Sequence, residues 1–391
     1  MRKIDNAMDV SLEKYDDTAE EHSYVEKLTQ INPTDTDQFL NVGVDTHEEY
    51  RSGTFIQKDN SVIHSKTLQD GVEVMSISRA QEKHPWLDEY IWKSVSPETD
   101  KFTAMANEKP REGYFIRSLP GVKVEHPVQS CLYIEKEGFA QNVHNIVIAE
   151  ENSEIHIITG CATAPHLMSG LHVGVSEFYV KKGAKLTFTM IHDWGDKINV
   201  RPRTVTHVEE GGVIVSNYIS LKPVGSLQMN PITYLDGKGA VARFNSVLVA
   251  GEGSHMDVGS TILLNQPNTR AEIISRAIVS GGTIIARGNM VGKVADIKAH
   301  LECKGLVLKD GLMQAVPELQ GHVPGVDMSH EAAVGKIDKR EIEYLMARGL
   351  NEEEAISTIV RGFLNVQIEG LPVNIAKKLD KAISETEKDM M

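Results

Sequence analysis

Three cysteines, Cys131, Cys161 and Cys303, are the residues of this chain best suited to sulfur or metal chemistry. An odd and sparse set in a chain of 391 residues argues against a disulfide framework. No CxxC pair occurs, which argues against a self-contained zinc site or a ferredoxin-like cluster site. Any metal or cluster would therefore need ligands other than cysteine, a second subunit or external thiols.

Cys131 and Cys161 differ in their expected surroundings. A lone buried cysteine usually packs as a small hydrophobic residue, and this interpretation is favoured for Cys131, where nothing else polar converges. For Cys161, packing and a reactive thiol are equally open interpretations. His192 occupies the equivalent place in the next of several similar segments, and a neighbouring imidazolium would favour the thiolate, the nucleophilic and metal-binding form.

Cys303 is followed, further along the chain, by the sequence Ser329-His330-Glu331. Cysteine, histidine and glutamate are all competent iron ligands. The spacing alone is weak support for a site, because a His–Glu pair ahead of a helix more commonly caps that helix or forms a surface ion pair. The sequence by itself therefore leaves a metal site and a structural role open here.

Several function classes are disfavoured by composition and by absent motifs. The chain has 41 basic and 55 acidic residues, a net charge of −14, which argues against nucleic acid and anionic membrane surfaces as partners. Neither a signal-peptide apolar region at the N-terminus nor an apolar run long enough to span a bilayer is found, so we expect a soluble, cytoplasmic protein. A phosphate-binding GxxxxGK[ST] loop, a GxSxG motif and an HExxH motif are all missing from the sequence.

The elements that would position these residues are six similar β-rich segments. Their starts lie 27 to 31 residues apart, at Ser153, Ala184, Val213, Ala240, Ala271 and Ala299. This spacing is too short for propeller blades and favours a parallel β-helix, with an elongated antiparallel β architecture as the alternative. Alternate residues of a strand face opposite sides, so counting from each start predicts that Cys161, His192 and Cys303 face the interior, and that His300 and Glu302 face away from it.

The two ends of the chain are predicted to be helical. We expect an N-terminal, mostly helical region over 1–115, with helices over 16–31 and 83–105, a β-helix core over 116–327, and a C-terminal helical region over 328–391. Asp338 and Glu341 are placed as in a capping box, Asn351 can cap the next helix, and a third helix is expected over 373–383. The apolar face of the second of these helices either packs on the end of the β-helix or docks a partner, and the sequence leaves both open.

Several motifs in order along the chain resemble the SufB/SufD family of the SUF iron–sulfur assembly system, and the SufB branch more closely. Gly160–Pro165 (GCATAP) resembles the family's GCTAP motif, and Met190–Trp194 resembles its next strand, with histidine where glutamine is common. His330–Ile337 resembles the family's HEATTSKI stretch, while Arg348–Leu350 and Glu352–Ile356 resemble its C-terminal helices.

The resemblance implies a right-handed parallel β-helix with helical ends that pairs with a second SufB or SufD chain and binds SufC, an ABC-type ATPase. It also implies that Cys161 receives persulfide sulfur, with His192 beside it on an interior route to Cys303. The same resemblance gives Cys303, His330 and Glu331 as the residues around a nascent iron–sulfur cluster at the dimer interface. The ATPase would bind residues of the C-terminal helices, namely Glu343, Arg348, Glu353, Ile356, Val360 and Phe363.

The chain also departs from the family pattern. It is shorter than typical SufB, lacks the N-terminal cysteine-rich motif of some members, and combines Cys303 with His330 and Glu331 in one subunit. We therefore expect a homodimer that needs no separate SufD. The expected function is that of an assembly scaffold rather than an enzyme, with a sulfur donor and apo-protein acceptors as further partners. The alternatives are a β-helix carbohydrate-active enzyme, for which no cluster of Asp, Arg or Lys is found, and a structural regulator of the ATPase that binds no cluster.

Overall fold

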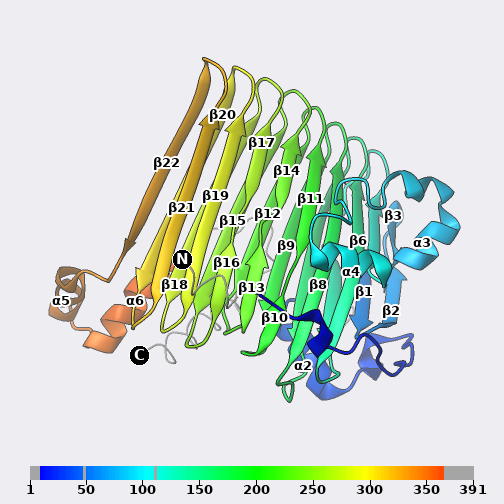
Figure 1. Ribbon diagram of the computed structural model, residues 1–391, viewed down its shortest axis with the longest axis horizontal. Helices are drawn as coiled ribbons and strands as arrows, with labels where there is room; N and C mark the ends of the chain where they lie inside the picture. Colours follow the sequence, from blue (N-terminus) through cyan, green and yellow to red (C-terminus); the bar gives the residue numbers. More distant parts are fainter. Residues whose placement is uncertain (1–8, 47–49, 110–111, 365–391) are drawn as a thin grey trace.

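The computed structural model describes residues 9–46, 50–109 and 112–364. It is a β-solenoid of about eight turns, with 48% of residues in strands and 16% in helices, most of which lie toward the two ends of the chain. Each turn contributes strands to two long sheets that run along the solenoid (Figure 1). The prediction of a mainly β, parallel β-helix fold is therefore confirmed.

The first sheet carries the cysteines and has ten strands. In spatial order they are β2 (Ser61–Thr67), β1 (Gly53–Lys58), β5 (Val128–Ile134), β7 (Glu154–Thr163), β9 (Lys185–Asp193), β12 (Val213–Ser220), β15 (Val241–Ala250), β18 (Arg270–Val279), β20 (Ile297–Val307) and β22 (Val326–Gly335). Apart from the β1–β2 hairpin, all of its neighbouring strands pair in parallel.

The second sheet faces the first across the core. Its main path is β10 (Ile198–Val200), β13 (Ser226–Met229), β16 (His255–Val258), β19 (Thr283–Gly292), β17 (Thr261–Leu264), β14 (Ile232–Leu235), β11 (Arg203–Val208), β8 (Gly170–Val180), β6 (Phe139–Ala149), β4 (Tyr114–Ser118) and β3 (Val72–Ser76), and β21 (Leu312–Gly321) pairs with β19. The main hydrophobic core consists of side chains from both sheets.

A residue in the left-handed backbone conformation precedes each strand of the first sheet from β7 onward. These residues have φ between 58° and 85° and are Asn152, Gly183, Gly211, Gly239, Asn268, Asp296 and Gly325. Glycine, asparagine and aspartate tolerate this conformation best, which explains the Gly/Asn/Asp punctuation between the β-rich segments. The same turn in each coil keeps successive strands in register.

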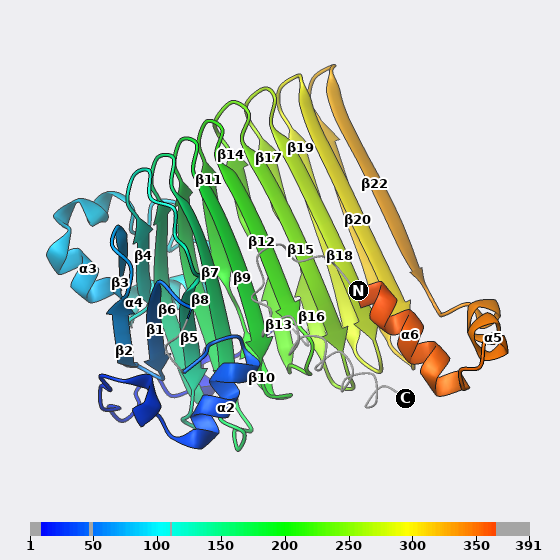
Figure 2. The ribbon, with the colours of Figure 1, turned by 180° about the vertical axis from the view of Figure 1, so that it is seen from behind.

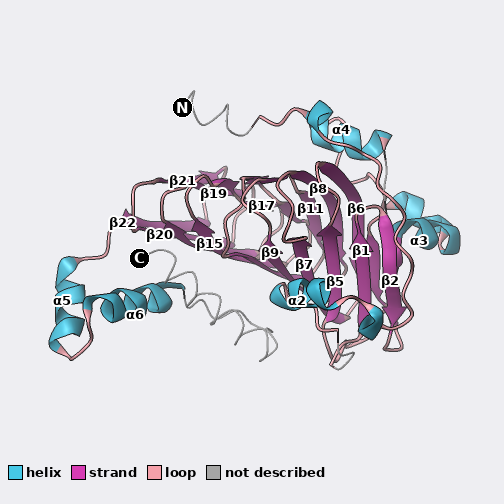
Figure 3. Ribbon diagram, turned by 90° about the horizontal axis from the view of Figure 1, so that it is seen from below, coloured by secondary structure: helices cyan, strands magenta, loops and turns pink. Residues whose placement is uncertain are grey.

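Short helices pack on the outer faces of the two sheets. In Figure 3, α4 (Lys101–Glu108) lies over the second sheet, where it contacts β6 and β8, and α2 (Pro33–Asn41) lies on the side of the first sheet, where it contacts β7. The remaining N-terminal helices are η1 (Leu12–Lys14), η2 (Leu28–Gln30), α3 (Ile77–Lys83) and η3 (Pro85–Glu89). Within the described residues, no helix is both long enough and apolar enough to cross a membrane.

The N-terminal region differs from the mostly helical region predicted for 1–115, because β1, β2 and β3 extend the two sheets. The helix expected over 16–31 is an extended segment that ends in η2, since its apolar residues pack against strands and Val25 N–H donates to Ile63 O. Pro33 begins a helix rather than following one, with Asn32 as its cap. The helix expected over 83–105 is instead η3 and α4, separated by irregular chain.

The C-terminal helices begin later than predicted. β22 carries the solenoid to Gly335, so the helical region starts at α5 (Lys339–Ala347) rather than at residue 328. Asp338 caps α5 through Arg340 N–H, whereas the reciprocal capping pair forms between Asn351 and Glu354 at α6 (Glu352–Leu364). The helix expected over 373–383 lies outside the described residues.

Gly160 of β7 lies directly beneath Val42, the residue that follows α2. A Cβ atom at position 160 would overlap Val42 Cγ2 and lie 2.7 Å from the Val42 backbone oxygen. We therefore expect Gly160→Ala to lower the free energy of unfolding by about 1–3 kcal/mol, because backbone cannot move aside easily. Urea denaturation measures this, with Gly335→Ala as the control, since no atom lies within 4 Å of a Cβ there. Equal losses in the two variants would contradict this packing.

Candidate functional site

The strand register of the first sheet places Cys161 and Cys303 on two adjacent rows of inward-facing side chains. The Cys161 row consists of Leu132, Cys161, His192, Ser220, Leu248, Ala277, Gly305 and Val334. The Cys303 row, two residues earlier on each strand, consists of Ser130, Thr159, Met190, Tyr218, Ser246, Ser275, Cys303 and Ala332. Both cysteines are buried, with 1% and 0% exposure.

His192 lies beside Cys161 in the strand register, as predicted, and belongs to a cluster of buried polar rings. Its Nδ1 lies 2.8 Å from the Tyr218 hydroxyl, and its ring contacts Trp194 at a centroid distance of 5.4 Å. Trp194 also contacts His172, whose Nδ1 is 2.9 Å from Gln141 Oε1. The interior next to Cys161 is therefore polar and aromatic rather than purely aliphatic.

Burial keeps both Cys161 and His192 uncharged. It raises the pKa of the Cys161 thiol and lowers the pKa of His192 well below its ordinary value, with the nearby His172 lowering the latter further. The expected imidazolium–thiolate pair is thus absent here, since the low-dielectric interior disfavours both ions. The pKa of Cys303 rises to about 11, through burial and the charge of Glu302, while Arg276 opposes the rise.

Polar side chains occupy the interior between the two cysteines. Cys161 on β7 and Cys303 on β20 are separated by five strand spacings, or about 24 Å at ~4.8 Å per strand. Tyr218, Ser246 and Ser275 lie between them on the Cys303 row, and Ser246 Oγ donates to Ser275 Oγ at 2.9 Å. The residues linking the cysteines are therefore mostly hydroxyl-bearing.

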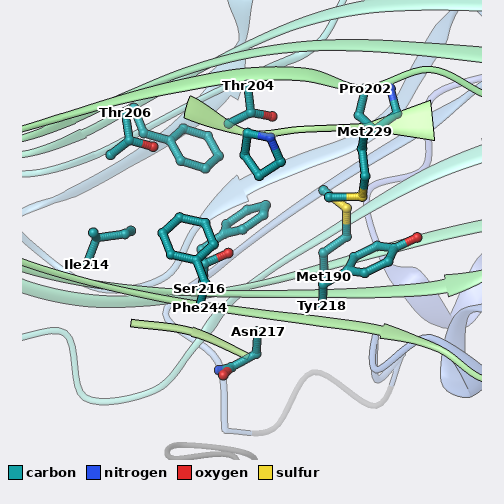
Figure 4. Close-up of a pocket in the computed structure, with 13 residues that line it drawn as sticks. Met190, Pro202, Thr204, Thr206, Ile214, Ser216, Asn217, Tyr218, Met229 and Phe244 are labelled. Carbon is teal, nitrogen blue, oxygen red and sulfur yellow. The ribbon is translucent and has the colours of Figure 1, made fainter. Parts of the chain in front are cut away.

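Two small cavities of about 30 Å³ each lie along this row. Tyr218, Met229 and Phe244 line both, and Ser246 and Ser275 line the second. Figure 4 shows the first cavity, where Met190 from the first sheet and Met229 from the second approach one another beside Tyr218. The interior is thus incompletely packed between Cys161 and Cys303.

His330 and Glu331 point to opposite faces of β22. His330 aligns with Leu301, so it shares the inward face of Cys303, two residues earlier along the strand. Glu331 aligns with Glu302 on the outward face, where Lys304 Nζ lies 3.0 Å from each of the two carboxylates and Arg276 pairs with Glu302. Within one chain, the structure therefore brings His330 but not Glu331 to the face of Cys303.

Cys303 lies one strand from the open end of the solenoid. In the described part of the chain β22 pairs only with β20, and β21 pairs only with β19. The side chains of this last coil are exposed to an unusual degree, including the apolar residues Leu312 (45%), Val323 (36%) and Val334 (44%). An unpaired strand edge with exposed apolar side chains is a surface suited to pairing with another chain.

Cys131 faces the opposite side of the sheet from Cys161. It aligns with Gly160, while its neighbour Leu132 aligns with Cys161. Cys131 is fully buried in the main core, and burial raises the pKa of its thiol. These surroundings agree with the interpretation of Cys131 as a small hydrophobic residue.

The residues expected to bind an ATPase divide into exposed and packed groups. Glu343 and Arg348 of the α5 region and Glu353 of α6 are exposed. Ile356 and Phe363 are half-buried against the core, and Val360 is 1% exposed. Figure 2 shows α6 crossing the outer face of the first sheet at β18, with which it makes contact. Part of the apolar face of α6 is therefore buried against the β-solenoid of the same chain.

One further group of possible metal ligands lies at the other end of the solenoid. Ligand atoms of His22, Asp59 and Glu135 lie within 4.8 Å of one another, the one such group found among the described residues. Its members already have partners, since His22 Nε2 is 2.9 Å from Asp59 Oδ2 and Lys58 Nζ is 2.7 Å from Glu135 Oε2. This group is remote from Cys303 along the strand order.

The buried histidines make stability depend on pH. Burial lowers the pKa of His144 to about 4 and of His172 to about 3. An unfolded histidine titrates near 6.5, so the stability that comes from burying the neutral rings is fully present above pH 6.5. It is lost as the pH falls toward 4 for His144 and toward 3 for His172. At pH 5 we expect a loss of about 2 kcal/mol for each such histidine. Urea unfolding at pH 7.5 and pH 5 measures it, and unchanged midpoints would contradict neutral burial.

Sequence comparison identifies the family. The SufBD core domain of the SUF system for FeS cluster assembly matches residues 132–363, which include both cysteine rows from Leu132 onward. The chain belongs to the SufBD family. An iron–sulfur cluster assembly SufBD family protein of Archaeoglobus fulgidus is 51% identical over 358 residues, covering 91% of this chain and 96% of the relative.

Two further SufBD relatives extend the comparison. A SufBD family protein of Methanothermobacter thermautotrophicus strain Delta H is 45% identical over 389 residues, covering 98% of this chain and 95% of the relative. The iron–sulfur cluster assembly protein SufB of Bacillus subtilis is 29% identical over 376 residues, covering 93% of this chain and 79% of the relative. The similarity to the SufBD family therefore extends over nearly the whole chain.

Proposed function

We propose that this SufBD protein is a scaffold on which iron–sulfur clusters are assembled, with the cluster held at Cys303. The observation that carries the proposal is the continuous interior row of polar side chains and cavities that leads from the region of Cys161 to Cys303. A packed structural core would favour aliphatic residues at such positions. ATP hydrolysis belongs to a partner subunit in this proposal.

Sulfur enters at Cys161 by thiol–persulfide exchange. The Cys161 sulfur attacks the outer sulfur of a donor persulfide, its new S–S bond forms as the donor's S–S bond breaks, and the Cys161 proton passes to the donor thiolate that leaves. His192 lies beside Cys161 on this route, which leads to Cys303. Two equivalents of an external thiol reductant release the outer sulfur from Cys161 as sulfide and become a disulfide, so that the sulfide is available to the cluster at Cys303. The closed interior excludes water from a reactive persulfide along the way.

A homodimer completes the site in this proposal. Cys303 lies one strand from the open end, so pairing of two such ends would bring two Cys303 residues toward a two-fold axis. His330 would act from the same face as Cys303. Glu331 faces outward within its own chain, so its contribution to the cluster requires rearrangement of the last strand or a position opposite the second copy.

A SufC-like ABC ATPase would bind α5 and α6. Glu343, Arg348 and Glu353 are exposed for such a contact, and Ile356 and Phe363 are partly exposed. Val360 supports the contact indirectly, because it anchors α6 to the core while α6 contacts β18, the neighbour of β20. Movement of α6 on ATP binding would therefore reach the strand next to Cys303, a two-state change biased by nucleotide.

The cellular setting follows from the same proposal. A scaffold with three free thiols is suited to the reducing cytoplasm, where a sulfur donor and apo-protein acceptors would be its further partners. The carbohydrate-active alternative is not favoured, because the polar side chains of the two cysteine rows lie inside the solenoid rather than in an open groove. A purely structural regulator of the ATPase would need neither the interior polar row nor its cavities.

The proposal is tested by anaerobic reconstitution with ferrous iron and a sulfur source. The wild-type protein is expected to develop visible charge-transfer absorption, both with a persulfide donor and with free sulfide. Cys161→Ser should lose at least about tenfold in rate with the persulfide donor, because serine cannot form a persulfide. With free sulfide the same variant should assemble normally. Absence of absorption in the wild-type dimer bound to its ATPase would exclude the scaffold function.

A further inference from the structure

Tyr218 connects the two inner rows of the first sheet. It is 5% exposed and lies on the Cys303 row, but its hydroxyl reaches His192 of the Cys161 row at 2.8 Å. The two rings meet edge to face, with centroids 5.0 Å apart and planes at 90°. A buried tyrosine thus makes its hydrogen bond to the side chain that is the register neighbour of Cys161.

The direction of this hydrogen bond follows from the chemistry of its partners. Burial raises the pKa of Tyr218 and lowers the pKa of His192, so a neutral phenol meets a neutral imidazole. In the part of the chain that the structure describes, His192 Nδ1 is the one hydrogen-bond partner of the Tyr218 hydroxyl. The phenol proton itself then needs an acceptor, and His192 Nδ1 provides it. A neutral imidazole that accepts at Nδ1 carries its proton on Nε2.

We propose that Tyr218 is a positioning residue that fixes the proton of His192 on Nε2, so that His192 presents an N–H donor to the sulfur of Cys161. Such a donor favours a sulfur anion, either the thiolate that attacks a donor persulfide or the perthiolate that forms afterwards. The role of Tyr218 in sulfur transfer rests on the proposed function. Its influence on the acidity of the Cys161 thiol does not depend on that function.

Trp194, in the same cluster as His192, offers a further N–H donor that could stabilise a negatively charged sulfur. The indole Nε1–H of Trp194 has no hydrogen-bond partner among the described residues, although Trp194 is only 4% exposed. Its ring contacts His192. Most buried donors in folded proteins have a hydrogen-bond partner, so this N–H is free to bond a group that forms beside His192. A negatively charged sulfur on Cys161, the register neighbour of His192, would provide an acceptor for this N–H.

The pH dependence of Cys161 alkylation by iodoacetamide tests the role of Tyr218, with each cysteine followed separately by peptide mass spectrometry. Hydrogen bonds to ions are stronger than those between neutral groups. Tyr218→Phe should therefore slow alkylation of Cys161 about tenfold near neutral pH and raise the apparent pKa of the thiol by about one unit. Tyr133→Phe is the matched control, since Tyr133 is also buried and its hydroxyl is 3.0 Å from Asp35 Oδ1 rather than near His192.

A double variant separates positioning from a general packing effect. Glutamine at position 192 carries its own N–H₂ donor and needs no tautomer to be fixed. Tyr218→Phe should therefore have no further effect in a His192→Gln background. An effect of the same size in both backgrounds, or alkylation of Tyr218→Phe at the wild-type rate, would overturn the proposal.

The protonation of His192 can also be read directly in the wild-type protein. With ¹⁵N-labelled histidine, the NMR spectrum should show the Nε2–H tautomer at this position, and the Nδ1–H tautomer would overturn the inference even if Tyr218→Phe failed to fold. Glutathione persulfide then separates the two proposals. If the expected alkylation profile holds but no sulfur is added to Cys161, sulfur transfer to Cys161 fails while the positioning role of Tyr218 stands.

Discussion

Cys303→Ser is expected to abolish cluster formation during anaerobic reconstitution with iron and sulfide, so that the charge-transfer absorption of the wild type is lost completely. Cys303 is the one cysteine close to the open end of the solenoid, where a second chain can contribute ligands. A serine hydroxyl at this place would have to ionise to bind iron, and the buried setting that raises the pKa of the thiol to about 11 disfavours an anion there. The visible absorption spectrum measures the loss.

Cys131→Ala is the matched control for this experiment. It removes a buried thiol of the same sheet that faces the opposite side from Cys161. This variant should keep the full absorption, and any decrease should follow its thermal stability rather than its iron content. Retention of the wild-type spectrum by Cys303→Ser would refute the proposed location of the cluster.

Val334→Arg is expected to weaken self-association at least about tenfold and to shift the protein toward monomer at micromolar concentration. Val334 is 44% exposed on the last strand, and it lies on the inward face at the open end. In a two-fold dimer of these ends, two arginines would approach one another and would need to lose water without a partner. Analytical ultracentrifugation measures the monomer–dimer equilibrium.

Met168→Arg provides the control for the dimer experiment. Met168 is a similarly exposed apolar residue, at 52%, but it lies between β7 and β8, several coils from the open end. Its substitution should leave the association constant unchanged. A monomeric wild-type protein, or equal weakening by both arginine variants, would show that the open end is not the interface.

The solenoid and its inward-facing cysteines could be predicted because one turn residue in each coil determines which residues of the following strand face the interior. From Cys161 onward, each member of the Cys161 row lies nine residues after the left-handed residue of its coil (152 to 161, 183 to 192, 211 to 220). The count from Val213 is one residue out of phase, because Val213 aligns with Lys185 rather than Ala184. Counting from Val213 therefore assigns Tyr218 to the outer face, whereas counting from Gly211 assigns it correctly to the inner face.

The errors at the two ends of the chain have a different origin. β1 and β2 form because they pair with β5 and with each other, and such pairing between distant segments leaves little signal in local helical spacing. The sequence predicts His330 and Glu331 ahead of a helix, but they lie on β22, whose only partner among the described strands is the preceding coil. The orientation of Glu331 depends on this register, so motif similarity alone could not supply it.

The left-handed turn residues also constrain how this architecture can change over evolution. Because Asn268, Asp296 and Gly325 recur after 28 and 29 residues, tandem duplication or loss of one whole coil would preserve the register between neighbouring strands. An insertion of odd length within a strand would instead exchange lining and surface side chains for the rest of that strand. The distance between Cys161 and Cys303 can therefore change only in discrete steps, each about one strand spacing, or ~4.8 Å, long.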